Sequence, residues 1–204
     1  MTGNSSQHAY VTWTKQRLDE MDAALASIET KASQLKADAK AKATQLNADL
    51  KKRRGDFEAE VKAHLKAGET ALQASKTQLE KQWESFEAEL KTYVETVGKD
   101  IDQKRTTFVD IAAAQAKAWG EAVEKLQSAA AELGAENRAK VDKAIAQLRA
   151  DTTEAKARLE EFKQGGDESW AALSAALQTS RKKFDEASQS AWEALKNSVP
   201  TIKS

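Results

Sequence analysis

The feature that most constrains this chain is the near absence of residues that interrupt a helix. Its single proline is Pro200, near the C-terminal end, and only 8 of its 204 residues are glycine. Alanine, lysine, glutamate, glutamine and leucine dominate, and all of these have high helix propensity. Aromatic residues make up only 6% of the chain, which disfavours strands. The composition is typical of a coiled coil or of long helices.

Apolar residues recur at steps of three and four residues, which places them on one stripe of a helix. The stripe is narrow and rich in alanine, so it suits two or three helices packed side by side better than a thick core. The clearest runs lie within 18–35, 79–97, 141–162 and 170–199. We therefore predict an all-α protein, built as elongated antiparallel coiled-coil hairpins or as a thin bundle of three to four helices.

Glycines mark the predicted ends of these helices. Gly165-Gly166-Asp167 is the strongest break, because two glycines end a helix and Asp167 can cap the next one. Gly98 is the second candidate, and Gly68 and Gly134 are weaker ones. Gly55 also resembles a stop followed by a start.

From these breaks we expect long helices over 9–67, 69–97, 100–163 and 167–198. They would form one helical hairpin over 9–98 and a second over 99–199. A flexible N-terminal tail would cover 1–8, and a C-terminal tail would cover 200–204.

Two short segments of the chain are similar to later ones. Gln45-Leu46-Asn47-Ala48-Asp49 is similar to Gln147-Leu148-Arg149-Ala150-Asp151, and Gln82-Trp83-Glu84 to Ala191-Trp192-Glu193. Such similarity indicates that the second hairpin repeats the first, with a repeat of about 100 residues. Chance similarity between alanine-rich helices is the alternative.

Charge is balanced over the whole chain, with 32 basic and 32 acidic residues, but it is unevenly distributed. Between Lys31 and Arg54 there are eight basic and two acidic residues; between Glu80 and Glu95 there are two basic and five acidic ones. Folding back near Gly68 would place the two stretches side by side. The balance disfavours nucleic-acid binding, which needs a basic excess. We interpret Lys51-Lys52-Arg53-Arg54 as part of a solvated, salt-bridged face.

Residue types that carry chemistry are scarce. The chain has no cysteine, which excludes disulfides, thiolate metal sites and cysteine nucleophiles. Its two histidines, His8 and His64, lack the spacing of metal ligands, and no phosphate-binding or catalytic motif is found. We expect no enzyme activity, no metal, no cofactor and no small-molecule substrate. The polar N-terminus resembles no signal peptide, and the longest uncharged stretch, 169–180, is too short to cross a bilayer. We therefore expect a cytoplasmic protein.

Five tryptophans stand out in the alanine- and leucine-rich stripes. Our first interpretation is packing, because a large ring fills the space between helices whose other residues are small. The second is a lipid-facing surface, because amphipathic helices with tryptophan and phenylalanine lie at membrane interfaces. The tryptophans are Trp13, Trp83, Trp119, Trp170 and Trp192. The candidate interaction surface consists of Trp83, Phe86, Trp170, Phe184, Trp192 and Leu195.

From Lys140 onward the chain contains KVDKAIAQLRADTTEAKARLEEF, then DESWAALSAAL, then KKFDEASQSAWEALKNSV. This series resembles the small bacterial stress-response coiled-coil family first described in cyanobacteria. In that family a long Lys/Glu/Ala helix precedes an amphipathic ending with two tryptophans, whose places Trp170 and Trp192 occupy here. The segment 79–97 resembles a weaker copy of the ending. Members of the family are typically about half as long as this chain, a difference that fits a duplication.

The resemblance implies a cytoplasmic, non-enzymatic helical protein associated with stress, with no catalytic residues. A looser similarity to apolipoprotein-like and phasin-like proteins implies helices that coat lipid or polyester surfaces. A narrow stripe needs a partner helix to be stable. We therefore expect first a protein that associates with itself or with another helical protein. The alternative is a protein that binds lipid membranes or storage-granule surfaces through amphipathic helices.

Overall fold

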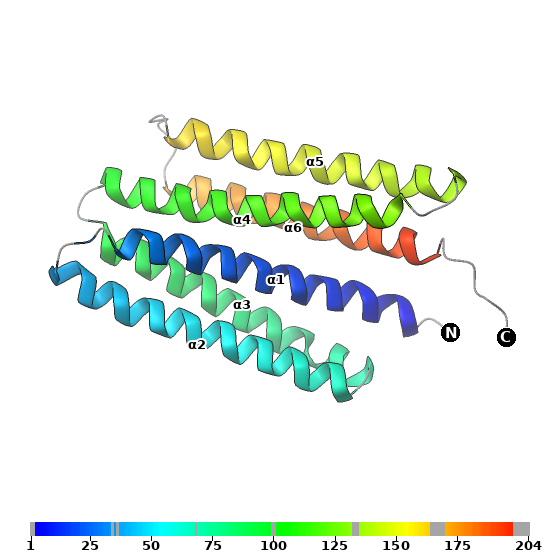
Figure 1. Cartoon of the computed structure of the whole chain (residues 1–204), viewed down its shortest axis with the longest axis horizontal. Helices are drawn as coiled ribbons and strands as arrows, with labels where there is room; N and C mark the ends of the chain where they lie inside the picture. The colour runs from blue at the N-terminus through cyan, green and yellow to red at the C-terminus, as the bar shows by residue number, and fades with distance from the viewer. Residues whose placement is uncertain are drawn as a thin grey trace. The chain divides into compact units, whose positions relative to one another are not determined.

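The computed structural model describes residues 3–33, 35, 37–67, 69–98, 101–131, 135–163 and 170–197. These residues form six α-helices and no strand (Figure 1). The helices are α1 (Gly3–Ala32), α2 (Ala37–Ala67), α3 (Glu69–Val97), α4 (Ile101–Ala130), α5 (Ala135–Lys163) and α6 (Trp170–Asn197). They pack against one another, so the prediction of an all-α helical bundle is confirmed.

Two of the predicted long helices are wrong, because each is divided into two. The predicted helix 9–67 is broken between α1 and α2, and the predicted helix 100–163 is broken between α4 and α5. At the end of α1, the Ser33 hydroxyl donates a 2.7 Å hydrogen bond to the carbonyl oxygen of Thr30. Such local bonds give the last turn an alternative to the helical ladder, which a search for glycine and proline does not detect. The second break contains Gly134, which the sequence had marked only as a weak break.

The remaining boundaries lie close to the predicted ones or are simple to explain. The predicted helix 69–97 is confirmed as α3, and 167–198 corresponds to α6. The helix α1 begins at Gly3, so the prediction of a flexible tail over 1–8 is wrong from that residue onward. The predicted tail 200–204 lies outside the described residues. Gly55 lies inside α2 without interrupting it.

Gly98 ends α3 for a steric reason. Its backbone N–H donates a 3.2 Å hydrogen bond to the carbonyl oxygen of Val94, closing the last turn. The residue is buried, and a Cβ atom at this position would collide with the side chain and backbone of Lys104. Glycine is therefore required for the chain to enter α4 at such close approach.

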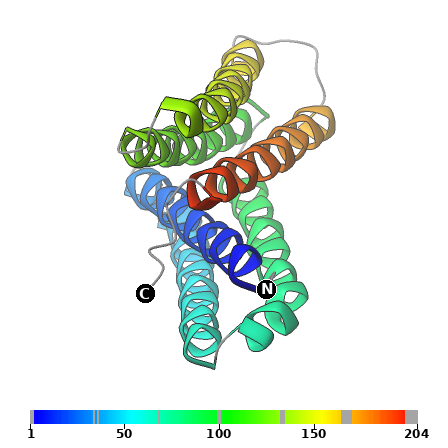
Figure 2. The same cartoon turned by 90° about the vertical axis from the view of Figure 1, so that its right-hand side faces the viewer.

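The chain divides into two compact units. Unit 2 is Arg17–Gln115, and unit 1 is Met1–Gln16 together with Ala116–Ser204. The division falls inside α1 and inside α4, so the units do not coincide with the predicted hairpins 9–98 and 99–199. In unit 2, α2 packs against α3; in unit 1, α5 packs against α6 (Figure 2).

Each helix buries one stripe. The first half of the chain buries Met21, Leu25 and Ile28 of α1, Leu50 and Phe57 of α2, and Leu79, Phe86 and Tyr93 of α3. Since the faces between these stripes are charged, the burial of one narrow face per helix accounts for the alternation of apolar and charged residues in the sequence.

The burial pattern of α1 and α2 recurs in α4 and α5. In α1 and α4 the buried residues recur at the same steps of four and three. The corresponding buried residues are Met21, Leu25 and Ile28 with Trp119, Val123 and Leu126, and then Ala43, Leu50, Phe57 and Val61 with Val141, Leu148, Ala155 and Leu159. This correspondence supports the predicted repeat.

The two similar segments of α2 and α5 also form the same bond. The amide Nε2 of Gln45 donates to Asp49 Oδ1 at 3.1 Å, and that of Gln147 donates to Asp151 Oδ1 at 2.9 Å. The buried stripes, however, correspond in a register about one helical turn away from this sequence similarity. Burial and local sequence therefore align the repeats differently.

Two leucines of α2 test the burial of this stripe. Leu50 has an exposed fraction of 0%, whereas Leu65 on the same helix is 41% exposed. Replacing Leu50 by alanine leaves a cavity, and we expect a loss of about 2–5 kcal/mol in the free energy of unfolding. Leu65→Ala is the matched control, with an expected change within about 0.5 kcal/mol. Urea unfolding followed by circular dichroism measures both, and equal losses would contradict the assignment of the stripe.

Candidate functional site

Each unit contains an arginine placed over a tryptophan ring, and that ring stacks on a phenylalanine. In unit 2 the guanidinium carbon of Arg17 lies 4.9 Å from the ring centroid of Trp83. The ring of Trp83 is stacked on that of Phe86, with centroids 5.9 Å apart and an interplanar angle of 21°. We call these three residues the aromatic cluster of unit 2.

Helix geometry places the two rings of this cluster together. Trp83 and Phe86 are three residues apart on α3, so they lie on the same face about one turn from each other. Arg17 comes from α1, and the cluster therefore joins two helices of unit 2. A guanidinium over an aromatic face contributes about 0.5–2 kcal/mol, with the larger value where water is excluded.

The aromatic cluster of unit 1 has the same composition from different helices. Trp119 lies on α4, while Arg181 and Phe184 lie on α6. The rings of Trp119 and Phe184 are stacked, with centroids 5.1 Å apart and an interplanar angle of 19°. The guanidinium carbon of Arg181 lies 6.0 Å from the centroid of Trp119, near the outer limit for a cation–π contact.

An ion pair is buried beside the aromatic cluster of unit 2. Arg17 Nη2 lies 3.2 Å from Glu20 Oε1, and the two side chains have exposed fractions of 1% and 0%. Removing two charges from water carries a large desolvation penalty, which their mutual attraction repays only in part. The ion pair therefore places a costly polar group in the middle of an otherwise apolar stripe.

Other buried polar side chains bond within their own helices. The hydroxyl of Thr14 donates to the carbonyl oxygen of Val11, and that of Thr152 donates to the carbonyl oxygen of Leu148, each at 2.8 Å. In unit 1, Gln16 Nε2 donates to Asp185 Oδ1 at 3.3 Å and so connects α1 to α6. Both interiors are thus interrupted by polar groups whose bonds are short in range.

Tyr93 on α3 is fully buried, and its hydroxyl has no hydrogen-bond partner among the described residues. Burial raises the pKa of Tyr93 to about 12, because the phenolate would lose its hydration. This residue is the clearest case in which packing perturbs an ionisable group.

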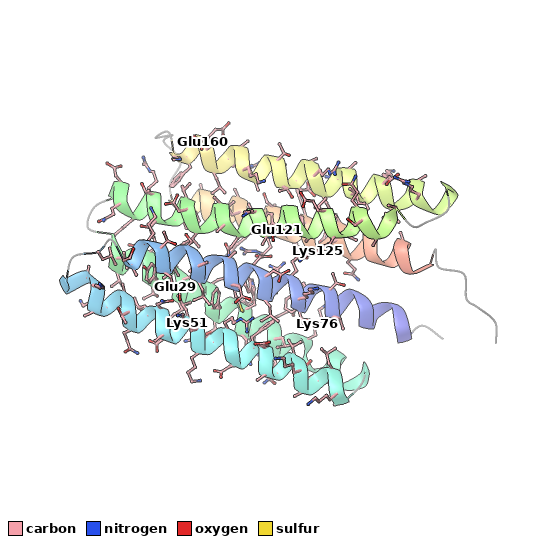
Figure 3. The ribbon with its side chains drawn as sticks, viewed as in Figure 1. Glu29, Lys51, Lys76, Glu121, Lys125 and Glu160 are labelled. Carbon is pink, nitrogen blue, oxygen red and sulfur yellow. The ribbon has the colours of Figure 1, made fainter. Side chains whose placement is uncertain are left out.

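The basic run Lys51–Arg54 is largely neutralised by ion pairs. Figure 3 labels Glu29 of α1 and Lys51 of α2, whose Nζ lies 2.5 Å from Glu29 Oε1. Arg53 bonds to Glu89 of α3 at 3.2 Å and to the hydroxyl of Ser85 at 2.7 Å.

Arg54 holds Asp22 of α1 through two bonds of 2.8 and 2.9 Å, and it also pairs with Glu58. Hydrogen bonds from Lys62 and then from Arg54 lower the pKa of the Glu58 carboxyl. These contacts confirm that α2 and α3 bring basic and acidic residues together, and they show that α1 supplies further acids.

The histidine His64 is half-buried, with Nε2 3.4 Å from Glu60 Oε1. The side chain of His8 lies outside the described residues. In the part of the chain that the structure describes, no group of three or more His, Cys, Asp or Glu side chains is placed to hold a metal ion. Among the same residues, no helix combines the length and the apolarity needed to span a membrane.

No known protein-family model, curated protein or solved structure matches this chain. The resemblance to the stress-response coiled-coil family therefore rests on the segment from Lys140 onward alone. In the structure, this segment corresponds to α5 and α6.

The structure places three of the six candidate surface residues inside the units. Trp83, Phe86 and Phe184 are buried, so in the folded units they pack between helices and do not form an exposed surface. The packing interpretation therefore holds for these three. The side chains of the other three, Trp170, Trp192 and Leu195, lie outside the described residues.

Sequence reasoning missed the cations of both clusters. Arg17 lies four residues before Met21 and so continues the buried stripe of α1, whereas the predicted stripe began at Leu18, which is half-buried. Arg181 lies three residues before Phe184, again one turn away. A charged residue in register with a stripe was the available signal.

The buried ion pair gives a stability prediction. Glu20→Gln leaves the buried guanidinium of Arg17 without its carboxylate, and we expect a loss of about 3–5 kcal/mol in the free energy of unfolding. The double variant Arg17→Met with Glu20→Leu removes both charges and should be within about 1 kcal/mol of the original chain, or more stable than it. Lys52 and Asp56, 75% and 56% exposed, form the control pair, and Asp56→Asn should cost less than about 0.5 kcal/mol. A double-mutant cycle in urea measures these values; a double variant as unstable as Glu20→Gln would contradict the prediction.

Tyr93 gives a pH prediction. Since folding raises its pKa from 10.0 to about 12, the folded state holds the phenolic proton more tightly than the unfolded state. Its contribution is complete below pH 10.0 and is lost as the pH rises towards about 12. The total loss is about 3 kcal/mol. Tyr93→Phe should remove this part of the pH dependence, as measured by urea unfolding of both chains below and above pH 10.0. Identical pH profiles for the two chains would refute it.

Proposed function

We propose that this chain is a non-enzymatic binding protein that opens its helical units and lays their apolar faces on a lipid or storage-granule surface. The observation that carries the proposal is the position of the aromatic clusters. Their rings, which suit a lipid–water interface, are stored inside units whose interiors also contain charged and hydroxyl groups.

The closed units expose little apolar surface. Among the described residues, Leu65 is the exposed large hydrophobic side chain. An apolar surface would therefore meet almost entirely polar faces unless the helices separated. Separation is the step that makes Trp83, Phe86, Trp119 and Phe184 available together.

The buried ion pair reduces the cost of this separation. In the closed unit Arg17 and Glu20 have lost their hydration, and opening returns both side chains to water. The ring of Trp83, which Arg17 covers in the closed state, would then face the lipid interface. The opened state thus recovers polar hydration while it keeps apolar burial.

A second candidate is self-association by exchange of helices between copies. It is favoured by the composition of unit 1, which combines Met1–Gln16 with Ala116–Ser204. Segments so far apart in sequence can be supplied by two different chains once a unit opens. The stripes that motivated self-association are otherwise buried within one chain.

Location and physiological role form part of the proposal. The absence of cysteine and the resemblance of the segment from Lys140 onward support a cytoplasmic protein that acts under stress. The buried hydroxyls of Thr14 and Thr152, already bonded within their helices, support a packing role for these groups and not a catalytic one.

Vesicle binding tests the proposal. We expect the chain to sediment with phospholipid vesicles, and brominated acyl chains to quench its tryptophan fluorescence, because the rings enter the bilayer interface. The double variant Arg17→Met with Glu20→Leu should bind several-fold more slowly, since its closed unit no longer gains hydration on opening. Lys52→Asp with Asp56→Lys, which reverses an exposed ion pair, is the matched control and should bind like the original chain.

Neither sedimentation nor quenching with any vesicle would refute lipid binding. Analytical ultracentrifugation of the lipid-free chain separates the second candidate, because helix exchange predicts a dimer whose share rises with concentration.

A further inference from the structure

The two units bury different residues at corresponding positions of α3 and α6. The described buried positions of α3 that correspond to α6 are Ser75, Leu79, Trp83 and Phe86; those of α6 are Ser180, Phe184, Ser188 and Ala191. Both sets follow the same steps of four, four and three residues, so they align one to one. In this register Trp83 corresponds to Ser188, and Phe86 to Ala191.

This difference weakens the packing of one helix. Two aromatic rings of α3 are replaced in α6 by a hydroxymethyl and a methyl group, and buried rings supply much of the apolar area in a helical core. Over the aligned stretch, Phe184 alone provides an aromatic contact for α6, through its stack on Trp119. The corresponding stretch of α3 is held by the stacked Trp83 and Phe86, with Arg17 over the former.

The charges of α6 also differ from those of α3. Arg181, Lys182 and Lys183 follow one another directly before Phe184, and Lys182 and Lys183 are exposed. Over its whole length α6 has four basic and three acidic residues, the acids including Asp185, which accepts a hydrogen bond from Gln16. By contrast, α3 is net acidic between Glu80 and Glu95. A basic run beside an apolar face suits anionic headgroups, whereas an acidic helix is repelled by them.

From these observations we propose that α6 is the helix that leaves its unit first, and that its face with Leu177, Phe184 and Ala191 binds an anionic phospholipid surface. This inference rests on the proposed function and names the element and the lipid class. Release exposes the apolar face of α6, and the run Arg181–Lys183 then contacts the headgroups that border it. The helix α3 stays packed in unit 2 while α6 binds.

Amide hydrogen exchange of the full chain tests release without lipid. We expect protection factors at 175–191 of α6 to be at least tenfold lower than those at 74–86 of α3. The variant Trp83→Ser with Phe86→Ala gives α3 the residues of α6 and should lower the protection of α3 to that of α6. Ser190→Ala, at an exposed position of α6, is the matched control and should leave both stretches unchanged. If the double variant fails to fold, the comparison within the original chain still decides.

The second arm adds vesicles of equal parts phosphatidylcholine and phosphatidylglycerol, or of phosphatidylcholine alone. We expect the 175–191 stretch to become protected on the anionic vesicles, with a severalfold smaller change on the neutral ones. Equal protection of α3 and α6 without lipid would overturn the inference even if the chain bound vesicles. Fast exchange of α6 that no vesicle slows would overturn its lipid assignment. Protection of α3 and not α6 on vesicles would leave the proposed function standing and reject α6 as its binding element.

Discussion

The structure depends on covering one narrow apolar face on each helix. None of the six helices is apolar all round, so each needs neighbours along its whole length to remove that face from water. The pairs α2–α3 and α5–α6 meet this need through short connections, and parts of α1 and α4 complete each unit. Because the faces are narrow, a single aromatic ring or a single charged side chain changes the local balance more than it would in a thick core.

Much of the fold follows from sequence because it is set by local rules. Periodicity and helix propensity predict the helices, and α3 is predicted to the residue at both ends. The uneven charges near Gly68 predict the ion pairs between α2 and α3, such as that of Arg53 with Glu89. Each of these inferences uses residues that lie within a turn of each other or on adjacent helices.

The features that sequence reasoning missed depend on tertiary context. The end of α1 is formed by a serine hydroxyl and not by a glycine, so a search for helix breakers passes over it. The burial of Arg17 depends on Glu20 and on a ring of α3, about sixty positions away, which periodicity alone cannot supply. The three candidate residues now seen to be buried illustrate the same limit, since a tryptophan in a stripe can face a neighbouring helix or a ligand with the same spacing.

The arginine–tryptophan–phenylalanine clusters show how two similar units reach similar packing by different routes. In unit 2 one helix supplies both rings and another supplies the cation; in unit 1 one helix supplies the cation and the phenylalanine, and another supplies the tryptophan. The composition of the cluster is retained while its sources are exchanged. Packing therefore constrains which groups meet more strongly than it constrains which helix carries each group.

The division of the chain inside α1 and α4 has a consequence for cooperativity. A helix propagates order from residue to residue, and Gln16 and Arg17 are consecutive although they belong to different units. Fraying that starts in the first half of α1 removes a wall from unit 1 and, by travelling one peptide bond further, deprives unit 2 of an end. Neither unit can melt without shortening a rod that the other one uses, so the chain should lose order in linked steps and not as two independent transitions.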